Sequence, residues 1–347
     1  MPSNKLIAID LFCGAGGLTV GLKKAGFKVI AGVEFNPVAA SSYIMNHRRV
    51  RLYERDIKGL SPLDVMADLG IVPGELDLLA GCPPCQGFSS HRTRNKASSV
   101  IDERNDLVFE FMKFVKCMKP KTIMMENVPG LAKDTRIDDV KAMLKDLGYY
   151  VDDNTVQVKD ASSFGVPQRR KRMILQASLY GAIGETPESK KGVTVWDAIG
   201  SLASPGVSGD YLHDLPTIRT KKVNDLISMV PKDGGSRSQL PIEYWLPCHI
   251  RKPGGYLDVY GRMAWKMVAP TITGGCISPS KGRFIHPEQD RAITLREAAL
   301  LQTFPRGYKF SLEKGKDSVA LMIGNALPPE FIKRHALQFK KHLTSFI

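Results

Sequence analysis

The sequence predicts an α/β protein with a doubly wound sheet and a smaller, irregular or β-rich insertion. Through the first half, short apolar runs alternate with segments of helical spacing, and several of the runs end at a glycine or an acidic residue. The pattern changes at about Ser178, after which Pro, Gly and Ser are frequent and apolar residues scatter up to about Asp290. Helical spacing then returns near the end of the chain.

The elements can be placed in order from these signals. Asn36-Pro37 and Thr294 are typical helix starts, and Pro120 ends a helix. Strands are expected at 5–10, 28–33, 51–56, 76–80, 121–125, 149–158 and 173–177. Helices are expected at 18–25, 36–43, 104–118, 138–147, 294–302 and 330–343.

A glycine-rich loop, Leu11-Phe12-Cys13-Gly14-Ala15-Gly16-Gly17, joins the first strand to the first helix. Glycine lets the backbone approach a ligand at a helix N-terminus, where free N–H groups favour a carboxylate or phosphate. Glu34 ends the next strand, at the spacing where ribose hydroxyls are held, and Asp56 ends the third. We expect both acids to face one ligand; the alternative is that they cap helices. The loop alone is weak evidence, because it departs from Gly-x-Gly-x-x-Gly.

The most informative stretch is Gly81-Cys82-Pro83-Pro84-Cys85-Gln86, which follows an apolar strand. A cysteine on a stiff Pro/Gly loop at the mouth of a strand is exposed and held in one direction, which suits a nucleophile. The basic run 91–96 could close over an anion such as a phosphate backbone. Cys82 and Cys85 also have the spacing of half a zinc site or a redox pair, but a second half-site is missing. We expect no metal.

The charge of the chain points to a polyanionic partner. The formal net charge is +14 and the pI is about 9.4. Residues 219–283 hold 11 Lys and Arg against four Asp and Glu, and Arg169-Arg170-Lys171-Arg172 forms a second basic block. A solvated face is the alternative, yet two basic regions and a basic loop beside the cysteine favour nucleic acid.

The composition excludes several classes of protein. At 347 residues, 43% hydrophobic and 24% charged, the chain is typical of a globular protein with one large and one smaller domain. No apolar run approaches about 20 residues, the length of a membrane span. Six unevenly spaced cysteines are too few for a disulfide framework. We expect an intracellular protein without a membrane partner.

Eight motifs in register resemble the DNA (cytosine-5) methyltransferase family across nearly the whole chain. They are Asp10-Leu11-Phe12-Cys13-Gly14-Ala15-Gly16-Gly17, Glu34, Asp56-Ile57, Pro83-Pro84-Cys85-Gln86, Glu126-Asn127-Val128, Gln168-x-Arg170-x-Arg172, Arg296-Glu297 with Gln302-Thr303-Phe304-Pro305, and Gly324-Asn325-Ala326-x-Pro328-Pro329. The resemblance implies a Rossmann-like class I methyltransferase sheet that uses S-adenosylmethionine and releases S-adenosylhomocysteine. It also implies a discontinuous catalytic domain of 1–177 plus 291–347 around a target-recognition domain of 178–290.

The resemblance assigns the chemistry to four positions. Cys85 would add to C6 of cytosine and make C5 nucleophilic enough to accept a methyl group. Glu126 would hydrogen-bond the exocyclic amine and N3 and supply a proton there. Arg172, supported by Arg170, would hold the O2 edge. The base that removes the C5 proton is not evident in the sequence.

The same resemblance implies a set of cofactor contacts. Glu34 would hold the ribose hydroxyls, Asp56 the adenine amine, and Phe12 would pack on the cofactor. The other expected contacts come from the loops around them: Gly14, Ala15, Gly17, Leu18, Phe35, Ile57, Pro84, Asn325 and Ala326.

A cytosine inside a duplex cannot reach Cys85, so the resemblance implies double-stranded DNA from which the base is flipped out. The loop 85–96 would close over the base, and a side chain near Ser90 or His91 would fill the vacated stack. Thr271 and Thr273 fit a Thr-(Leu/Ile/Val) element of the recognition region. The expected DNA contacts are Ser89, Ser90, His91, Arg92, Arg94, Arg262, Thr271 and Thr273. Any one of them could instead contact phosphate alone.

Three other functions are less consistent with the sequence. An RNA (tRNA) cytosine-5 methyltransferase shares the scaffold, but its Cys-Phe-Thr motif is not found in the recognition region. A non-catalytic regulator of DNA has no need of Cys85, Glu126 and Arg172 together, and a Rossmann dehydrogenase lacks the proline-cysteine loop. Two residues depart from the family pattern: Cys82, where glycine is commoner, and Phe35, where tryptophan is frequent.

The compact length resembles a bacterial or phage modification enzyme. Such a protein is expected to be a monomer and to act separately from a cognate restriction endonuclease. We expect it in the cytoplasm of a prokaryote, associated with the nucleoid, or in the nucleus of a eukaryote.

Overall fold

The computed structural model describes residues 5–84, 106–251 and 254–346, and the chain divides into two compact units. Unit 1 comprises Met1–Phe164, Lys171–Glu188 and Pro328–Ile347; unit 2 comprises Gly165–Arg170 and Ser189–Leu327. The polypeptide therefore passes from one unit to the other four times. This division differs from the expected one, because residues 165–170 and 291–327 group with unit 2 and residues 178–188 group with unit 1.

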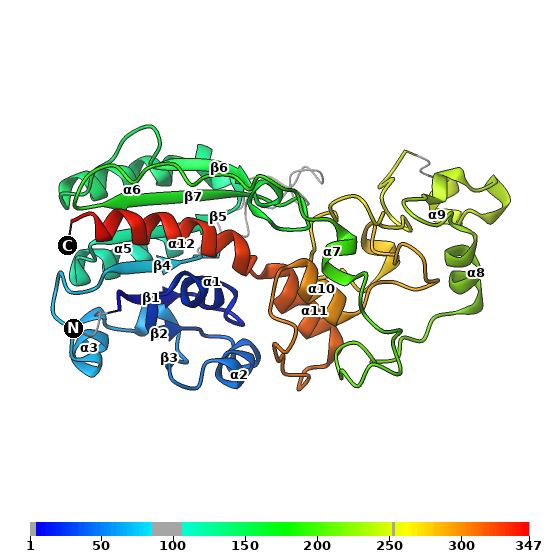
Figure 1. Cartoon of the computed structure of the whole chain (residues 1–347), viewed down its shortest axis with the longest axis horizontal. Helices are drawn as coiled ribbons and strands as arrows, with labels where there is room; N and C mark the ends of the chain where they lie inside the picture. The colour runs from blue at the N-terminus through cyan, green and yellow to red at the C-terminus, as the bar shows by residue number, and fades with distance from the viewer. Residues whose placement is uncertain (1–4, 85–105, 252–253, 347) are drawn as a thin grey trace. The chain divides into compact units, whose positions relative to one another are not determined.

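Unit 1 is built on a seven-stranded sheet in the order β3-β2-β1-β4-β5-β7-β6 (Figure 1). Neighbouring strands from β3 to β5 are parallel, whereas β7 is antiparallel to both β5 and β6. The strands are β1 (Ile7–Leu11), β2 (Lys28–Val33), β3 (Arg51–Tyr53), β4 (Leu78–Gly81), β5 (Thr122–Asn127), β6 (Val156–Asp160) and β7 (Lys171–Ser178). The central parallel strands are nearly all apolar because both faces of the sheet are covered. The predicted α/β class is confirmed.

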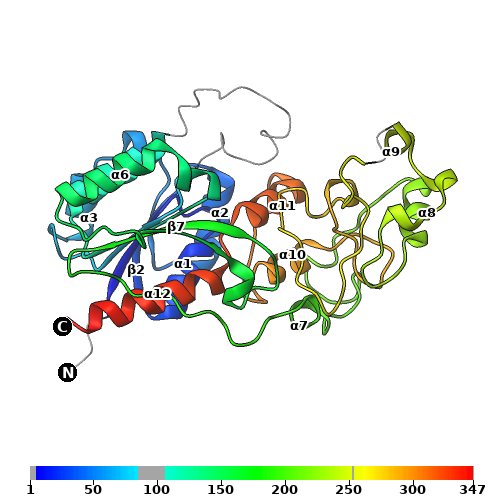
Figure 2. The ribbon, with the colours of Figure 1, turned by 90° about the horizontal axis from the view of Figure 1, so that it is seen from above.

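Helices cover both faces of the sheet (Figures 1 and 2). They are α1 (Gly17–Ala25), α2 (Pro37–Asn46), α3 (Pro62–Leu69), α5 (Leu107–Met118), α6 (Thr135–Asp146) and α12 (Pro329–Thr344). α12, from the end of the chain, packs on α1, and Gly21 permits this close approach because a Cβ there would lie 2.5 Å from Cβ of Ile332. α3, α5 and α6 form a row of neighbours on the other face.

Most of the expected elements are confirmed, and β2 has the predicted bounds. The strand expected at 149–158 is displaced, because Tyr150 forms only an isolated bridge, a turn covers 153–154, and β6 begins only at Val156. Sequence reasoning missed α3, which begins after the cap Ser61, and α11 (Gly315–Asn325).

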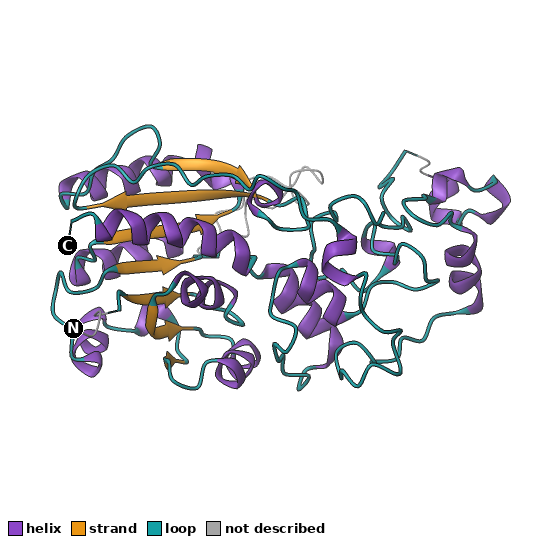
Figure 3. Ribbon diagram, viewed as in Figure 1, coloured by secondary structure: helices purple, strands orange, loops and turns teal. Residues whose placement is uncertain are grey.

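Unit 2 consists mainly of loops joined by short helices (Figure 3). These are α7 (Val195–Ile199), α8 (Lys221–Met229), α9 (Pro247–Arg251), α10 (Leu295–Leu301) and α11. Over its described residues it has isolated bridges such as Arg262 with Ile285 but no strand, so an irregular insertion is confirmed and a β-rich one is wrong. Across the described ranges, no helix of either unit is long and apolar enough to span a bilayer.

Candidate active site

The expected site residues of unit 1 gather at the carboxyl edge of the parallel strands. Phe12 follows β1, Glu34 follows β2, Asp56 follows β3, Pro84 follows β4, and Glu126 lies near the end of β5. Ligands of open α/β sheets bind at this edge, because the loops diverge there and leave room. The fold therefore brings together the positions that the motifs singled out.

The glycine loop has a backbone that few side chains tolerate. Phe12 has φ of 63°, in the left-handed region that is rare for a bulky residue, and Gly14 and Gly16 have φ of 53° and 96°. A Cβ on Gly14 would meet nothing within 4 Å, so there is open space beside the loop. Ala15 and Leu18 are buried, which leaves their backbone groups as the parts that could line a ligand.

Glu34 is held by the glycine loop itself. Its Oε2 accepts a hydrogen bond of 2.8 Å from the Gly14 N–H, and its Oε1 accepts one of 2.7 Å from the Asn36 N–H. Burial raises the pKa of Glu34 above its usual range, and the two N–H donors oppose this shift. Phe35, the next residue, leaves 70% of its surface exposed. An oriented carboxylate beside an open aromatic ring suits a ligand that has both hydroxyls and a flat ring.

Asp56 and Ile57 start a 3₁₀ turn after β3. Asp56 is exposed, and its Oδ1 caps this turn by accepting a 3.0 Å hydrogen bond from the Lys58 N–H. Its expected contact with the cofactor stays a prediction. Ile57 is buried.

Glu126 and Arg172 form an ion pair in unit 1. Arg172 Nε lies 2.8 Å from Glu126 Oε1, and only 7% of the Glu126 side chain and 16% of the Arg172 side chain are exposed. The sheet creates this pair, because β5 and β7 are antiparallel neighbours. An ion pair that is this well shielded from water keeps both side chains in a fixed direction.

Asn127 ties the loop after β4 to β5. Its Nδ2 donates a 2.8 Å hydrogen bond to the Pro83 carbonyl, and its Oδ1 accepts one of 2.8 Å from the Val128 N–H. Asn127 belongs to the Glu126-Asn127-Val128 motif, but the sequence predicted no role for it. Cys85, with Ser89, Ser90, His91, Arg92 and Arg94, lies outside the described residues.

Asp10 is a second group that sequence reasoning left without a role. The Thr19 hydroxyl donates a 2.6 Å hydrogen bond to its Oδ2, and within the described ranges its buried Oδ1 has no hydrogen-bond partner. Burial raises the pKa of Asp10 from 3.8 to about 7, and the hydrogen bond from Thr19 opposes this. No residue pattern could have signalled the shift, which depends on complete burial.

Two expected site arginines are structural anchors. Arg170 belongs to unit 2, where its guanidinium donates to the Ile272 carbonyl at 3.0 Å and to the Gly324 carbonyl at 2.8 Å. It therefore joins two segments of unit 2, and its expected support of Arg172 stays a prediction. Its neighbour Gln168 also binds within unit 2, accepting from the Ile272 N–H at 3.0 Å.

Arg262 is fully buried, which corrects its expected DNA contact. Its guanidinium donates to four backbone carbonyls, those of Ile227, Val230, His286 and Gln289, and pairs with Asp290. A side chain with this set of partners has no donor left for a nucleic acid.

The remaining expected contacts lie in unit 2. The Thr271 hydroxyl donates a 2.7 Å bond to the Arg169 carbonyl, and Thr273 Oγ1 accepts one of 3.4 Å from the Gly275 N–H. Asn325 ends α11 and Ala326 is its C-cap. Across the described residues, no three His, Cys, Asp or Glu side chains are grouped so that they could hold a metal ion.

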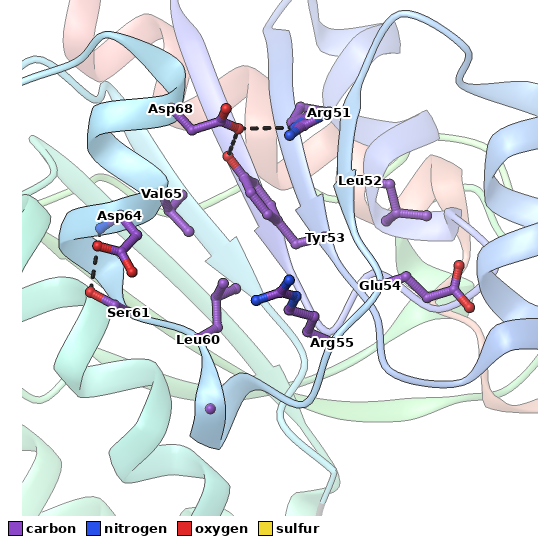
Figure 4. A pocket seen from close by; sticks show the side chains of 11 residues that line it. Arg51, Leu52, Tyr53, Glu54, Arg55, Leu60, Ser61, Asp64, Val65 and Asp68 are labelled. Carbon is purple, nitrogen blue, oxygen red and sulfur yellow. Dashed lines mark hydrogen bonds and ion pairs between the residues drawn. The ribbon is translucent and has the colours of Figure 1, made fainter.

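A cavity of about 330 Å³ lies between β3 and α3 (Figure 4). Asp68 lies on its wall and accepts hydrogen bonds from Tyr53 Oη at 2.6 Å and Arg51 Nε at 2.9 Å. Glu54, Arg55 and Ser61 also line it, but Glu34, Asp56 and Ile57 do not. This cavity is therefore separate from the expected cofactor residues.

Comparison with known proteins identifies the family. The profile of C-5 cytosine-specific DNA methylases matches residues 6–341. The chain belongs to this family. The resemblance seen in the sequence motifs is thereby confirmed, and so is the enzyme class, DNA cytosine-5 methyltransferase.

The methylase has relatives of similar length. The Type II methylase M.HgiDII of Herpetosiphon aurantiacus is 38% identical over 96% of this chain and 95% of its own. The Type II methyltransferase M1.HphI of Haemophilus parahaemolyticus is 32% identical over 93% of this chain and 84% of its own. A solved DNA modification methyltransferase encoded within an E. coli prophage shares the fold, with a TM-score of 0.74 and 23% identity over 98% of this methylase and 100% of that chain.

Proposed function

We propose that this methylase transfers a methyl group from S-adenosylmethionine to C5 of a flipped-out cytosine in a specific DNA duplex sequence. The transfer proceeds through a covalent bond between Cys85 and C6. Because the relatives at 38% and 32% identity are Type II enzymes, we assign the protein to the modification half of a restriction-modification system, acting as a monomer in a prokaryotic cytoplasm and separately from a cognate nuclease.

The observation that carries the proposal is the shielded ion pair of Glu126 and Arg172. It lies at the end of β5, whose neighbour β4 leads directly into the Pro83-Pro84-Cys85 loop. A carboxyl group and a guanidinium on one rigid framework can bind both hydrogen-bonding edges of a cytosine ring. The bond from Asn127 to the Pro83 carbonyl supports the loop that carries the nucleophile.

The bonds and protons of the proposed reaction can be followed step by step. The Cys85 thiolate adds to C6, which forms an S–C6 bond and places electron density on C5 and N3. Glu126, in its protonated form, supplies a proton at N3 as this charge develops, and Arg172 holds the O2 edge. After C5 has taken the methyl group, its proton is lost to a base and the S–C6 bond breaks, which returns the thiolate. N3 gives its proton back to Glu126, which leaves neutral 5-methylcytosine.

The chain offers groups that fit the cofactor. S-adenosylmethionine supplies an electrophilic methyl group when bound. The open space beside Gly14, the fixed carboxylate of Glu34 and the exposed ring of Phe35 suit its ribose and adenine. We also assign Phe12, Gly17, Asp56, Ile57, Pro84, Asn325 and Ala326 to this site, with Ala15 and Leu18 contributing their backbones.

Unit 2 is the proposed target-recognition region. Its basic surplus supports binding to a phosphate backbone, and Thr271 and Thr273 are proposed contacts. Ser89, Ser90, His91, Arg92 and Arg94 remain proposed contacts of the loop that closes over the flipped base.

The test is to incubate the protein with tritiated S-adenosylmethionine and either mixed-sequence duplex DNA or total tRNA. Cys85→Ala is the inactive variant, and Cys117→Ala, which changes a partly buried thiol on α5, is the matched control. We expect label in DNA with the wild type and the control, and none with Cys85→Ala. Label in tRNA alone would assign the protein to the RNA-modifying alternative. No label in either, with the cofactor still bound, would indicate a non-catalytic protein.

A further inference from the structure

Unit 2 contains a second buried arginine, Arg237, whose donors are mostly unpaired. It begins a 3₁₀ turn (Arg237–Gln239) between α8 and α9 in the chain (Figure 1), and only 1% of its surface is exposed. Its Nη2 donates a 2.9 Å hydrogen bond to the Gly255 carbonyl. Over the described residues, its Nε and Nη1 have no hydrogen-bond partner, and no acidic side chain pairs with its charge. Because a buried charge is normally paired, this guanidinium is unfavourable in the free protein.

An aromatic ring and an imidazole lie beside Arg237. Its guanidinium carbon is 5.2 Å from the centroid of the Trp245 ring, the distance of a cation–π contact. The Trp245 ring is fixed, because its Nε1 donates a 3.0 Å hydrogen bond to the Leu240 carbonyl. His249 is also buried, and its Nδ1 has no partner among the described residues. The same short segment therefore holds three buried nitrogen atoms whose hydrogen bonds are not made.

The segment around Arg237 places apolar side chains outside and a cation inside. Five large apolar residues there leave 45–64% of their surface exposed: Ile242, Tyr244, Ile250, Tyr256 and Leu257. This is the reverse of ordinary burial, in which charged groups are exposed and apolar groups are covered. Exposed apolar residues concentrated in one segment mark an interaction site.

Duplex DNA is the partner whose chemistry fits this segment. Residues 219–283 carry 11 Lys and Arg against four Asp and Glu, a surplus that attracts a polyanion. DNA offers phosphate oxygens and, in its major groove, the O6 and N7 atoms of guanine. All of these are acceptors, and the unpaired groups of Arg237 are all donors.

We propose that Arg237 contacts DNA: its guanidinium is covered in the free protein, and in the complex it turns outward and donates its unpaired N–H groups to acceptor atoms of the duplex. This inference rests on the proposed function, which places unit 2 on DNA. The complex relieves the unfavourable burial of the charge, so DNA favours the conformation in which Arg237 is exposed. Arg262 has no such role, because all of its donors are already paired.

The test compares Arg237→Met with two control variants. Arg262→Met removes a buried arginine that is fully paired, and Lys221→Met removes an exposed charge of α8 that pairs with Asp225. Stability is measured by urea unfolding. DNA affinity is measured by fluorescence anisotropy with two labelled duplexes, one carrying the methylated site found by bisulfite sequencing and one with that site scrambled. The titrations are repeated over a series of salt concentrations with S-adenosylhomocysteine present.

We expect Arg237→Met to unfold at the same urea concentration as the wild type or at a higher one, because methionine fills the space without a buried charge. Arg262→Met should unfold earlier. The affinity of Arg237→Met for the target duplex should fall about tenfold or more, and Lys221→Met should change it much less.

The two duplexes distinguish the acceptors. An equal fall on both, with a salt slope smaller by about one, assigns Arg237 to a phosphate. A fall on the target duplex alone assigns it to a base edge.

Two results would overturn the inference. One is wild-type affinity of Arg237→Met for both duplexes, whatever its stability. The other is a loss of affinity together with a loss of stability like that of Arg262→Met, since a structural role would then explain both. Failure of the proposed function is separate, because the wild type itself would then leave no label in DNA.

Discussion

Asp10→Asn should make the protein more stable at alkaline pH and should flatten the pH dependence of its stability. Asp10 is completely buried, and burial raises its pKa from 3.8 to about 7. Between these two values the folded protein retains a proton that the unfolded chain has released. Stability is therefore lost as the pH rises through this window, and it stays low above it.

The magnitude follows from the two pKa values. The pKa of Asp10 differs by about 3 units between the folded and unfolded states, and each unit corresponds to about 1.4 kcal/mol. Once the carboxyl group is charged in both states, the free energy of unfolding is therefore lower by about 4 kcal/mol. Part of this loss is already present at pH 5. The free energy of unfolding of the variant, relative to that of the wild type, should therefore rise by about 2.5 kcal/mol from pH 5 to pH 8. Asparagine keeps an acceptor for the Thr19 hydroxyl but leaves its amide unpaired, which costs about 1–3 kcal/mol at every pH.

The measurement is urea unfolding followed by circular dichroism at pH 5, 6, 7 and 8. His47 and His335, whose pKa values burial lowers to about 3, change stability in the opposite direction over part of this range. Only the difference between variant and wild type therefore isolates Asp10. Asp139→Asn, which removes an exposed carboxyl group of α6, is the matched control. A difference between Asp10→Asn and wild type that does not change with pH would show that Asp10 titrates normally.

Three further predictions concern both units. Arg262→Met should destabilise unit 2 by about 3–5 kcal/mol in urea unfolding, because it removes a buried, fully paired guanidinium. A loss of DNA affinity without a loss of stability would instead make Arg262 a DNA contact. Glu34→Gln should weaken S-adenosylhomocysteine binding about tenfold in calorimetry, the effect of one charged acceptor, and an unchanged affinity would remove Glu34 from the cofactor site. Gly324→Ala should lower stability by about 1–3 kcal/mol or more in thermal unfolding, because the added Cβ would lie 2.2 Å from the Gly274 nitrogen. A variant with the unfolding midpoint of the wild type would contradict this close approach.

The fold was predictable where the sequence carries a local signal. β2 and α1 could be placed because an apolar run or helical spacing begins and ends at glycine or an acid. α11 could not, since its first residues, Gly315-Lys316-Asp317, resemble a turn, and its helical state depends on packing against α10. Local pattern is a weak guide where tertiary packing decides the state.

The site was predictable as a set of positions but not as a set of contacts. The motifs marked Glu126 and Arg172, and the antiparallel pairing of β5 and β7 explains how they meet. The same kind of reasoning gave Arg170 and Arg262 functional roles, because a sequence does not show whether an arginine is buried. The raised pKa of Asp10 could not be predicted for the same reason, since it comes from complete burial in the folded protein.

The short segment Gly165–Arg170 limits how unit 2 can be exchanged between relatives by recombination. It groups with unit 2 although it precedes β7, and its Gln168 and Arg170 bind Ile272 and Gly324 of the later segment. A gene conversion that replaced only 189–327 would leave these two side chains facing foreign partners. Viable hybrids between relatives should therefore inherit both pieces from one parent, or differ little in the backbone around 272 and 324.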